Sequence, residues 1–403
     1  MRWRVPVTLS VFLLGILAYK GYTSLPQSKA QAAAEAMLER SFAAGWSGNE
    51  TSIPTLEERV KQEPGNPKWN AALGQAYLQR ARESGDPSFY TKSETLFDRA
   101  LSANPKSTEA VLGKATLAMA RHDFRGARAL AESAIAASPD VVSSYGVLTD
   151  AEVELGDYDA AVKTLDHMVR RKPNLSSYSR VSYVRELMGD TDGAIKAMRM
   201  AVESGSPFGE NTAWCMVQLG NLYLNSGKLA DAESQYQTAL VRFPDYAHAL
   251  GGLARLAVAR DEWDKAAHYY QLAMDRIPLP EFAIGLGDVY ERMGKAAEAK
   301  SQFDLVEAIQ KIQRANGVST DIEMALFHAD RGENLDGAIE VAAREWSWRK
   351  SVRVADVYAW TLYRAGRFVE AQKMMQQAMR LGTRDPLFLR HAQAIALKTQ
   401  KES

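Results

Sequence analysis

The sequence predicts an all-α solenoid of helical hairpins, and three observations support this fold class. Apolar residues recur at helical intervals, small residues return at matching places, and prolines punctuate the pattern with a constant period. Four intervals between prolines are each 34 residues long: Pro105 to Pro139, Pro139 to Pro173, Pro173 to Pro207, and Pro244 to Pro278. Because a fixed period of this length is the signature of a repeat array, we expect stacked hairpins in place of one compact core.

The repeat is clearest between residues 211 and 244. Residues 211–226 and 229–243 both carry apolar side chains at helical spacing, with Gly227 between them and Pro244 after the second stretch. This pattern predicts two helices joined by a tight turn. At about 100° per residue, the first helix divides into a packing face and an opposite face; the packing face carries Met216, Leu219, Gly220 and Tyr223, and the opposite face carries Trp214, Val217, Asn221 and Leu224.

Small residues are expected where the two helices of this hairpin cross. Gly220 and Ala239 lack bulk at those points, which allows the two backbones to approach closely. A glycine inside a helix costs about 1 kcal/mol of helix propensity. The packing around Gly220 must therefore return more than that.

These residues resemble the tetratricopeptide repeat (TPR) family, whose pattern reads L-G-x2-Y, then an alanine and an aromatic residue, then proline. The run Leu219-Gly220-x-x-Tyr223 is followed by the rest of the pattern, and the same positions return in two other hairpins. The repeat positions that carry the resemblance are Gly74, Gly220, Tyr223, Ala232, Tyr236, Ala239, Pro244, Gly287, Tyr290 and Ala299. The resemblance implies a right-handed superhelix whose first helices line a concave groove that holds a peptide or a partner protein.

Residues 1–23 predict a transmembrane signal anchor. Arg2 and Arg4 precede an apolar run that carries no charge before Lys20. A helix over residues 5–22 would extend about 27 Å, close to a hydrocarbon thickness of about 30 Å. A cleaved signal peptide is the alternative, but the first small-x-small site, Ser28 to Ala30, lies far beyond the apolar run. The positive-inside rule then places the N-terminus in the cytoplasm and the repeats outside it.

The remaining chain is divided by its pattern into five parts. Residues 24–66 predict a helical stalk and N-terminal cap, 67–315 an array of seven TPR hairpins, 316–351 a degenerate TPR-like hairpin, 352–386 a last hairpin, and 387–403 a C-terminal capping helix. The interval from Gly74 to Phe97 is 23 residues, against 16 from Gly220 to Tyr236. The first hairpin is therefore expected to have either a protruding loop or longer helices.

Composition and motifs exclude several classes of function. Lys plus Arg equals Asp plus Glu at 49 each, so no global charge directs the chain to nucleic acid. The single cysteine, Cys215, is expected to be a small buried side chain. The six histidines form no H-E-x-x-H pair, and no Walker motif occurs. We therefore expect no catalytic residues, no cofactor and no metal ion.

The candidate site is the concave groove, formed by first-helix residues opposite the packing face. Asn221 and Asn225 lie one helical turn apart and are expected to offer paired amides to an extended peptide. The full set of predicted groove residues is Gln75, Gln79, Tyr183, Glu186, Trp214, Asn221, Asn225, His248, Arg255, Glu281, Asp288 and Glu291.

The sequence thus favours a membrane-anchored scaffold or adaptor that binds a protein or peptide in its groove. We expect a single-pass protein of the bacterial cytoplasmic (inner) membrane, with an extracytoplasmic repeat array that acts in envelope assembly or secretion. Two alternatives stay open. One is an accessory subunit that binds a glycan or small ligand for a partner enzyme, and the other is a cytosolic regulatory TPR protein. If the signal is cleaved, the protein would be periplasmic or secreted.

Overall fold

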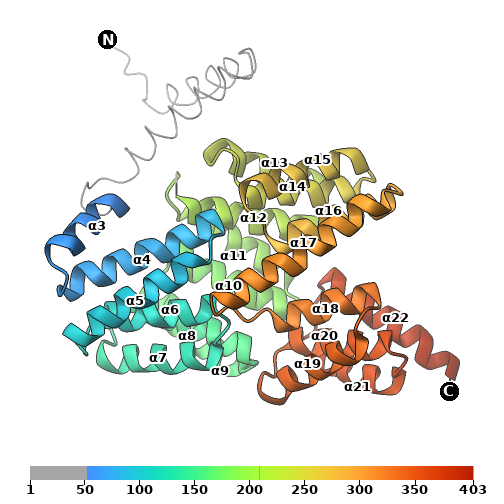
Figure 1. Cartoon of the computed structure of the whole chain (residues 1–403). Helices are drawn as coiled ribbons and strands as arrows, with labels where there is room; N and C mark the ends of the chain where they lie inside the picture. The colour runs from blue at the N-terminus through green and yellow to red at the C-terminus, as the bar shows by residue number, and fades with distance from the viewer. Residues whose placement is uncertain (1–51, 208, 403) are drawn as a thin grey trace, which may run out of the picture. The chain divides into compact units, whose positions relative to one another are not determined.

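The computed structural model describes residues 52–207 and 209–402, and every regular element in that part of the chain is helical. A short helix, α3 (Ile53–Gln62), precedes nine helical hairpins in the described residues, and α22 (Pro386–Glu402) follows them (Figure 1). The first helices of the hairpins are α4 (Pro67–Ser84), α6 (Thr108–Ala120), α8 (Val142–Leu155), α10 (Leu175–Leu187), α12 (Glu210–Asn225), α14 (Ala247–Ala259), α16 (Pro280–Arg292), α18 (Asp321–Arg331) and α20 (Val352–Arg364). The second helices are α5 (Ser88–Ala103), α7 (Phe124–Ala137), α9 (Tyr158–Arg171), α11 (Thr191–Glu203), α13 (Leu229–Arg242), α15 (Trp263–Arg276), α17 (Ala296–Ala315), α19 (Leu335–Trp348) and α21 (Phe368–Ala378), the last extended by the 3-10 turn η1 (Met379–Leu381). The all-helical solenoid expected from the repeat pattern is confirmed.

Each hairpin turns through at least one residue in the left-handed backbone region. In seven of the nine described turns that residue is glycine, for which a positive φ carries no steric cost. His122 and Asp261 take this position in the other two, with φ of 62° and 56°. A left-handed residue just past a helix end is a common way to stop a helix and reverse the chain. The turns are therefore short and nearly uniform, which keeps the repeat geometry regular.

Aromatic rings of the second helices fill the space left by glycines of the first helices. The ring of Tyr236 on α13 lies between Gly220 on α12 and Gly252 on α14, and a Cβ added at either glycine would come within 2.5 Å of it. Phe97 on α5 lies in the same way between Gly74 and Gly113. Both rings are fully buried. The glycine predicted to sit at a helix crossing therefore accepts a ring, and that ring joins two successive hairpins.

Alanine marks the start of the second helix in the same register. The fourth residue of every described second helix after α5 is an alanine that is at most 2% exposed. These alanines are Ala127, Ala161, Ala194, Ala232, Ala266, Ala299, Ala338 and Ala371. A methyl side chain at this point allows the backbones of the two helices to approach closely.

The first helices are buried on more sides than one packing face requires. Val217, which the helical spacing placed on the groove face of α12, is 2% exposed and belongs to the core. Trp214 and Leu224 pack against the same cluster while remaining partly accessible. The one-face expectation fails for Val217 because α12 contacts helices of the preceding and following hairpins as well as its own partner. Only part of the predicted groove face of α12 is therefore accessible.

The first hairpin is enlarged by longer helices. Helix α4 has 18 residues and α5 has 16, and only three residues separate them. Of the two alternatives for this hairpin, the structure therefore shows the second. Helix α17 is also extended, to 20 residues, and its C-terminal end reaches α6 through a contact described next (Figure 1).

Turns of early hairpins contact linkers of late hairpins, and we call this set of contacts the seam. It consists of four contacts. They join the turns inside the first four hairpins, in order, to the linkers that follow α15, α17, α19 and η1. The second contact joins the turn after α6 to the linker after α17. In it, Nε of Arg121 donates to the carbonyl oxygen of Asn316 at 3.1 Å. The carbonyl oxygen of Arg121 in turn accepts from the amide of Ser319 at 3.1 Å.

The third contact of the seam is the most extensive. The amide of Lys350 donates to the carbonyl oxygen of Leu155 at 2.9 Å, and the amide of Val352 donates to the hydroxyl of Tyr158 at 2.8 Å. The Arg349 side chain is 4% exposed, pairs with the Glu154 carboxylate and lies 4.3 Å from the centre of the Phe124 ring. A buried cation with these partners is strongly held in place.

The first and fourth contacts of the seam join the same relative positions of the array as the second and third. Gly85 approaches the side chain of Ile277, and Gly189 approaches the backbone of Gly382, so closely that neither Gly85 nor Gly189 has room for a side chain. In all four contacts, the turn inside one hairpin touches the linker that follows the hairpin five places further along the chain. The described hairpins therefore make one superhelical turn and then contact themselves.

The predicted anchor, residues 1–23, and most of the predicted stalk lie outside the described residues. Within residues 52–207 and 209–402, no helix combines the length and the apolar character that crossing a membrane requires.

The ring between two glycines predicts a measurable cost of overpacking. Gly220→Ala places a methyl group 2.5 Å from the Tyr236 ring, and we expect the free energy of unfolding to fall by about 1 to 3 kcal/mol. Urea unfolding followed by circular dichroism measures it. Gly65→Ala is the control, because no atom lies within 4 Å of a Cβ at that position. Equal unfolding midpoints for the two variants would contradict this packing.

The seam predicts a local effect of removing Arg349. Arg349→Ala leaves Glu154 without its cation and opens space beside Phe124, so we expect faster amide hydrogen exchange at Lys350 and Val352. Exchange should remain unchanged in α12, which is distant in sequence and makes none of these contacts. Arg170→Ala, which removes an exposed pair with Asp166 on one helix, serves as the control. Unchanged exchange at Lys350 in Arg349→Ala would show that the side chain does not hold the seam.

Candidate functional site

A cavity of about 610 Å³ lies on the groove side of the first helices. It is bordered by α8, α10, α11 and α12 and by the C-terminal end of α4. Its lining residues are Arg82, Asp150, Leu175, Ser176, Ser179, Arg180, Tyr183, Glu186, Met198, Asn211, Trp214, Gln218, Asn221 and Leu222. A cavity of this size and mixed polarity suits a side chain or a short segment of a ligand. We call it the groove pocket.

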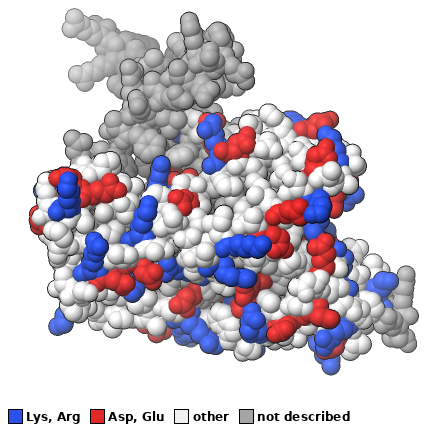
Figure 2. Space-filling model, in the orientation of Figure 1, with Lys and Arg blue, Asp and Glu red and all other residues white. Residues whose placement is uncertain are grey.

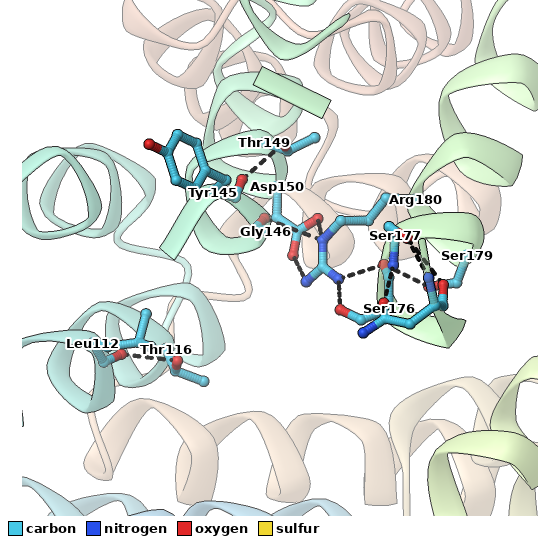
Figure 3. A network of polar contacts seen from close by, with 11 residues as sticks. Leu112, Thr116, Tyr145, Gly146, Thr149, Asp150, Ser176, Ser177, Ser179 and Arg180 are labelled. Carbon is cyan, nitrogen blue, oxygen red and sulfur yellow. Dashed lines mark hydrogen bonds and ion pairs between the residues drawn. The ribbon is translucent and has the colours of Figure 1, made fainter. Parts of the chain in front are cut away.

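Arg180 is the most heavily bonded side chain of the groove pocket (Figure 3). Its Nε and Nη2 donate to the two carboxylate oxygens of Asp150 at 2.9 and 2.6 Å, which is a bidentate pair between α10 and α8. Its Nη1 donates to the hydroxyl and carbonyl oxygens of Ser176, and Nε also reaches the carbonyl of Gly146. Desolvation by the surrounding protein raises the pKa of Asp150, and Arg180 opposes that rise. The pair is a rigid and internally neutral part of the wall.

Arg82 is paired as well, through a contact that crosses the groove. Its guanidinium lies 3.0 Å from the carboxylate of Glu210 at the start of α12. Glu210 also accepts from the hydroxyl of Tyr246 at 2.6 Å and from the amide of Gln79 at 3.4 Å. The predicted groove residue Gln79 thus helps to join α4 to α12.

Asn221 is engaged by its own chain. Its carbonyl oxygen accepts from the hydroxyl of Tyr236 at 2.8 Å and from Arg255 at 2.5 Å, and its amide nitrogen donates to Gln218 at 3.2 Å. Burial raises the pKa of Tyr236 to about 12, so its hydroxyl remains a donor at neutral pH. Asn225, one turn further along, is exposed. The carbonyl oxygen of Asn221 therefore already has two donors, and the paired-amide arrangement expected with Asn225 would have to displace them.

Glu186 and Tyr183 form the part of the wall on α10 that points toward the C-terminal hairpins. Tyr183 is 41% exposed. Desolvation and the nearby carboxylate of Asp385, just before α22, raise the pKa of Glu186 to about 7. Among the described residues no cation pairs with this carboxylate, in contrast to Asp150 and Glu210.

The other predicted groove residues lie outside the groove pocket. His248 is half-buried beside the rings of Tyr246 and Phe282, and burial lowers its pKa. Asp288 and Glu291 are bound by Arg331, at 2.6 and 3.4 Å. Gln75 is half-buried and Glu281 is exposed. Of the twelve predicted residues, the structure brings together Tyr183, Glu186, Trp214 and Asn221 as lining of one cavity.

Sequence reasoning missed the polar residues that precede Tyr183 on α10. Ser176, Ser179 and Arg180 lie on the same side of that helix one and two turns earlier, and all three line the groove pocket. Extending the face of Tyr183 and Glu186 toward the N-terminus of the helix would have found them. Nothing in the local sequence identifies Arg82, because its position in the wall depends on the superhelical turn.

Two further expectations concern cysteine and metal. Cys215 is fully buried, and burial raises the pKa of its thiol to about 12. The thiol is therefore a packed, protonated side chain at neutral pH. Within the described residues, no three His, Cys, Asp or Glu side chains gather closely enough to hold a metal ion.

Comparison with known families agrees with the hairpin geometry. Two family models, both described as tetratricopeptide repeat, match this chain: one at residues 80–142 and 217–279, the other at residues 118–182. Residues 80–182 and 217–279 are thus recognised as tetratricopeptide repeats. A search among curated proteins found no significant match.

Several solved structures are similar to this chain. The human IFIT1 dimer with PPP-AAAA is 14% identical, with a TM-score of 0.52 over 93% of this chain and 88% of that one. PilW, described as a widely conserved type IV pilus biogenesis factor, is 16% identical over 50% of this chain and 92% of its own, with a TM-score of 0.42. A thermophilic TPR protein of Thermus thermophilus is 23% identical over 50% of this chain and 99% of its own, with a TM-score of 0.38. At these identities the likeness concerns the fold alone.

The bonds of Asn221 predict a structural cost that Asn225 does not share. Asn221→Ala removes the acceptor of the buried Tyr236 hydroxyl, and we expect about 1 to 3 kcal/mol of destabilisation. Asn221→Asp keeps an acceptor beside Tyr236 and Arg255, so its melting temperature at pH 7 should stay near that of the unaltered protein. Asn225→Ala is the matched control on the same helix and should not change the melting temperature. Thermal unfolding measures the melting temperatures of the three variants. An Asn221→Ala protein as stable as Asn225→Ala would contradict the assigned bonds.

Proposed function

We propose that this TPR chain is a membrane-anchored scaffold that holds an extended segment of a protein partner in its groove. The observation that supports the proposal best is the groove pocket itself. First helices of successive hairpins place amide, hydroxyl and aromatic groups around one cavity of about 610 Å³. Extended peptides bind through such groups, which satisfy the peptide backbone and hold its side chains.

The size of the cavity and the seam favour a flexible occupant. A folded domain does not fit a cavity of this volume, whereas a few residues of an extended chain do. The seam contacts also hold the linkers after α17 and α19 against the turns after α6 and α8. We therefore propose that the partner offers a terminal tail or a loop, and that the scaffold recognises this segment in its extended form.

The charge distribution supports a protein partner over nucleic acid. On the face shown in Figure 2, positive and negative side chains are interspersed, without a broad area of one sign. In the groove pocket, Arg82 and Arg180 are both neutralised by carboxylates. Nucleic-acid binding relies on cations that remain available for phosphates. Apart from Glu186, the wall residues offer neutral or already paired groups, so we propose a binding role without catalysis, cofactor or metal.

We further propose that residues 5–22 anchor the chain in a bacterial cytoplasmic membrane, with the repeats on the outer side. The support is the sequence pattern of two arginines, an apolar run and Lys20. A scaffold held there would present its groove to proteins in transit or in assembly in the cell envelope. Carbonate extraction of membranes, together with protease treatment of spheroplasts, tests the topology. Extraction of the chain by carbonate would contradict the anchor.

Site-specific crosslinking tests the groove. Benzoylphenylalanine, a photoreactive amino acid, replaces either Tyr183 or Val241. Tyr183 lines the groove pocket, whereas Val241 lies on α13 and its side chain is 70% exposed. In cells of the source organism we expect a discrete crosslinked protein from position 183 and none from position 241. Equal labelling at both positions, or labelling at 241 alone, would show that the partner does not occupy the groove.

A further inference from the structure

One carboxylate of the groove pocket differs from all the other charged groups that line it. Arg82 is paired with Glu210, and Arg180 is paired with Asp150. Glu186 has no cation within bonding distance among the described residues, although it lines the same cavity. The formal charge left after pairing is therefore a single negative charge, located at Glu186.

One aromatic side chain lies a helical turn from this carboxylate, and a second one lines the same cavity. Tyr183 lies three residues before Glu186 on α10, and Trp214 lines the cavity from α12. Tyr183 is 41% exposed, so its ring is accessible from the groove. Aromatic faces attract ammonium and guanidinium groups, and they pack well against the aliphatic stems of lysine and arginine. A carboxylate one helical turn from an accessible aromatic ring is a suitable environment for such a side chain.

We propose that the groove pocket takes a lysine or arginine side chain of the bound segment, with its cation on the carboxylate of Glu186 and its stem against Tyr183. This inference rests on the proposed function, because it assigns the side chain by which the groove selects its peptide. The selected side chain is a cation because the only unpaired charge among the described residues that line the pocket is negative.

The electrostatics of the pocket agree with a cationic occupant. Desolvation, and secondly the carboxylate of Asp385, raise the pKa of Glu186 to about 7. A cation beside Glu186 would offset both causes. The remaining charged groups of the wall are the Arg180 and Asp150 pair and Arg82 with its partner Glu210, and Tyr183 is uncharged at neutral pH because its pKa is raised by desolvation. An anionic segment would meet Glu186 and Asp385, while both arginines of the described wall are already paired.

The test uses the full-length chain and an array of immobilised twelve-residue peptides of random sequence. Each peptide that contains lysine or arginine is paired with a copy in which norleucine replaces it, because norleucine keeps an aliphatic stem and lacks the charge. Three proteins are compared: the unaltered chain, Glu186→Gln, and Glu298→Gln. Glu298 is an exposed carboxylate on α17 that lies outside the groove pocket, so it controls for the loss of one negative charge.

The unaltered chain and Glu298→Gln should bind basic peptides about tenfold more tightly than their norleucine copies, because a charge-assisted hydrogen bond has this order of effect. Glu186→Gln should bind both copies alike, at the level of the norleucine copy, which also shows that its groove is folded. Peptides that bind without a preference for lysine or arginine, or a preference that survives in Glu186→Gln, would overturn the cationic pocket and leave the peptide-binding function in place. An array on which no peptide binds would overturn both.

The pH dependence gives a second readout. Below pH 7 the free protein holds a proton on Glu186, and the neutral carboxyl should bind a basic peptide no better than Glu186→Gln does, so affinity should fall about tenfold in total between pH 7 and pH 5. Above pH 7 the carboxylate is ionised and the affinity should level off. Glu186→Gln should show a flat profile with the same peptide. A profile of the unaltered chain that is equally flat would contradict the role of Glu186.

Discussion

The insertion of an aromatic ring between two glycines is the packing constraint on which the rest of the solenoid depends. Tyr236 contacts Gly220 of its own hairpin and Gly252 of the next one, so a single side chain sets both the distance inside a hairpin and the distance between hairpins. Phe97 does the same at the start of the array, between Gly74 and Gly113. Because repeat stability is a sum of local and nearest-neighbour interfaces, a ring that belongs to both interfaces couples them directly.

The seam follows from the regularity that this packing produces. When each hairpin is rotated by nearly the same amount against the last, small rotations accumulate until the turns of early hairpins reach the linkers of later ones. The register of five hairpins is the same at Gly85, Arg121, Leu155 and Gly189. None of these contacts is large, but their common register means that a change in one hairpin's rotation would shift all the contacts beyond it. The groove wall therefore depends on packing far from the groove.

The sequence was informative about local packing and less so about the groove. Periodic glycines, alanines and aromatic residues report contacts between neighbouring elements, so Gly220, Ala232 and Tyr236 could be assigned correctly from spacing. Polar groove residues take their partners from other hairpins, and spacing within one helix does not reveal them. Asn221 bonds Arg255 one repeat later, and Gln79 reaches Glu210 through the superhelical turn. Asn221 and Arg255 lie 34 residues apart, at the same position of successive repeats, so their contact was open to prediction. The contact between Gln79 and Glu210 depends on the curvature of the whole array and could not be predicted from spacing. Spacing within one helix likewise did not reveal that Val217 is buried.

Paired charges give the groove its chemical character. Arginines in a concave protein surface would favour phosphates or carboxylates if they were free, but Arg180 and Arg82 donate their hydrogen bonds to Asp150, Ser176 and Glu210. These bonds hold α8, α10, α4 and α12 in fixed relation and leave the wall rigid before any partner arrives. A preformed wall lowers the entropy lost on binding. The side chains that stay accessible, Tyr183, Trp214 and Glu186, are then those by which a ligand can be distinguished, and selectivity in this groove is set by the few groups that the fold itself does not use.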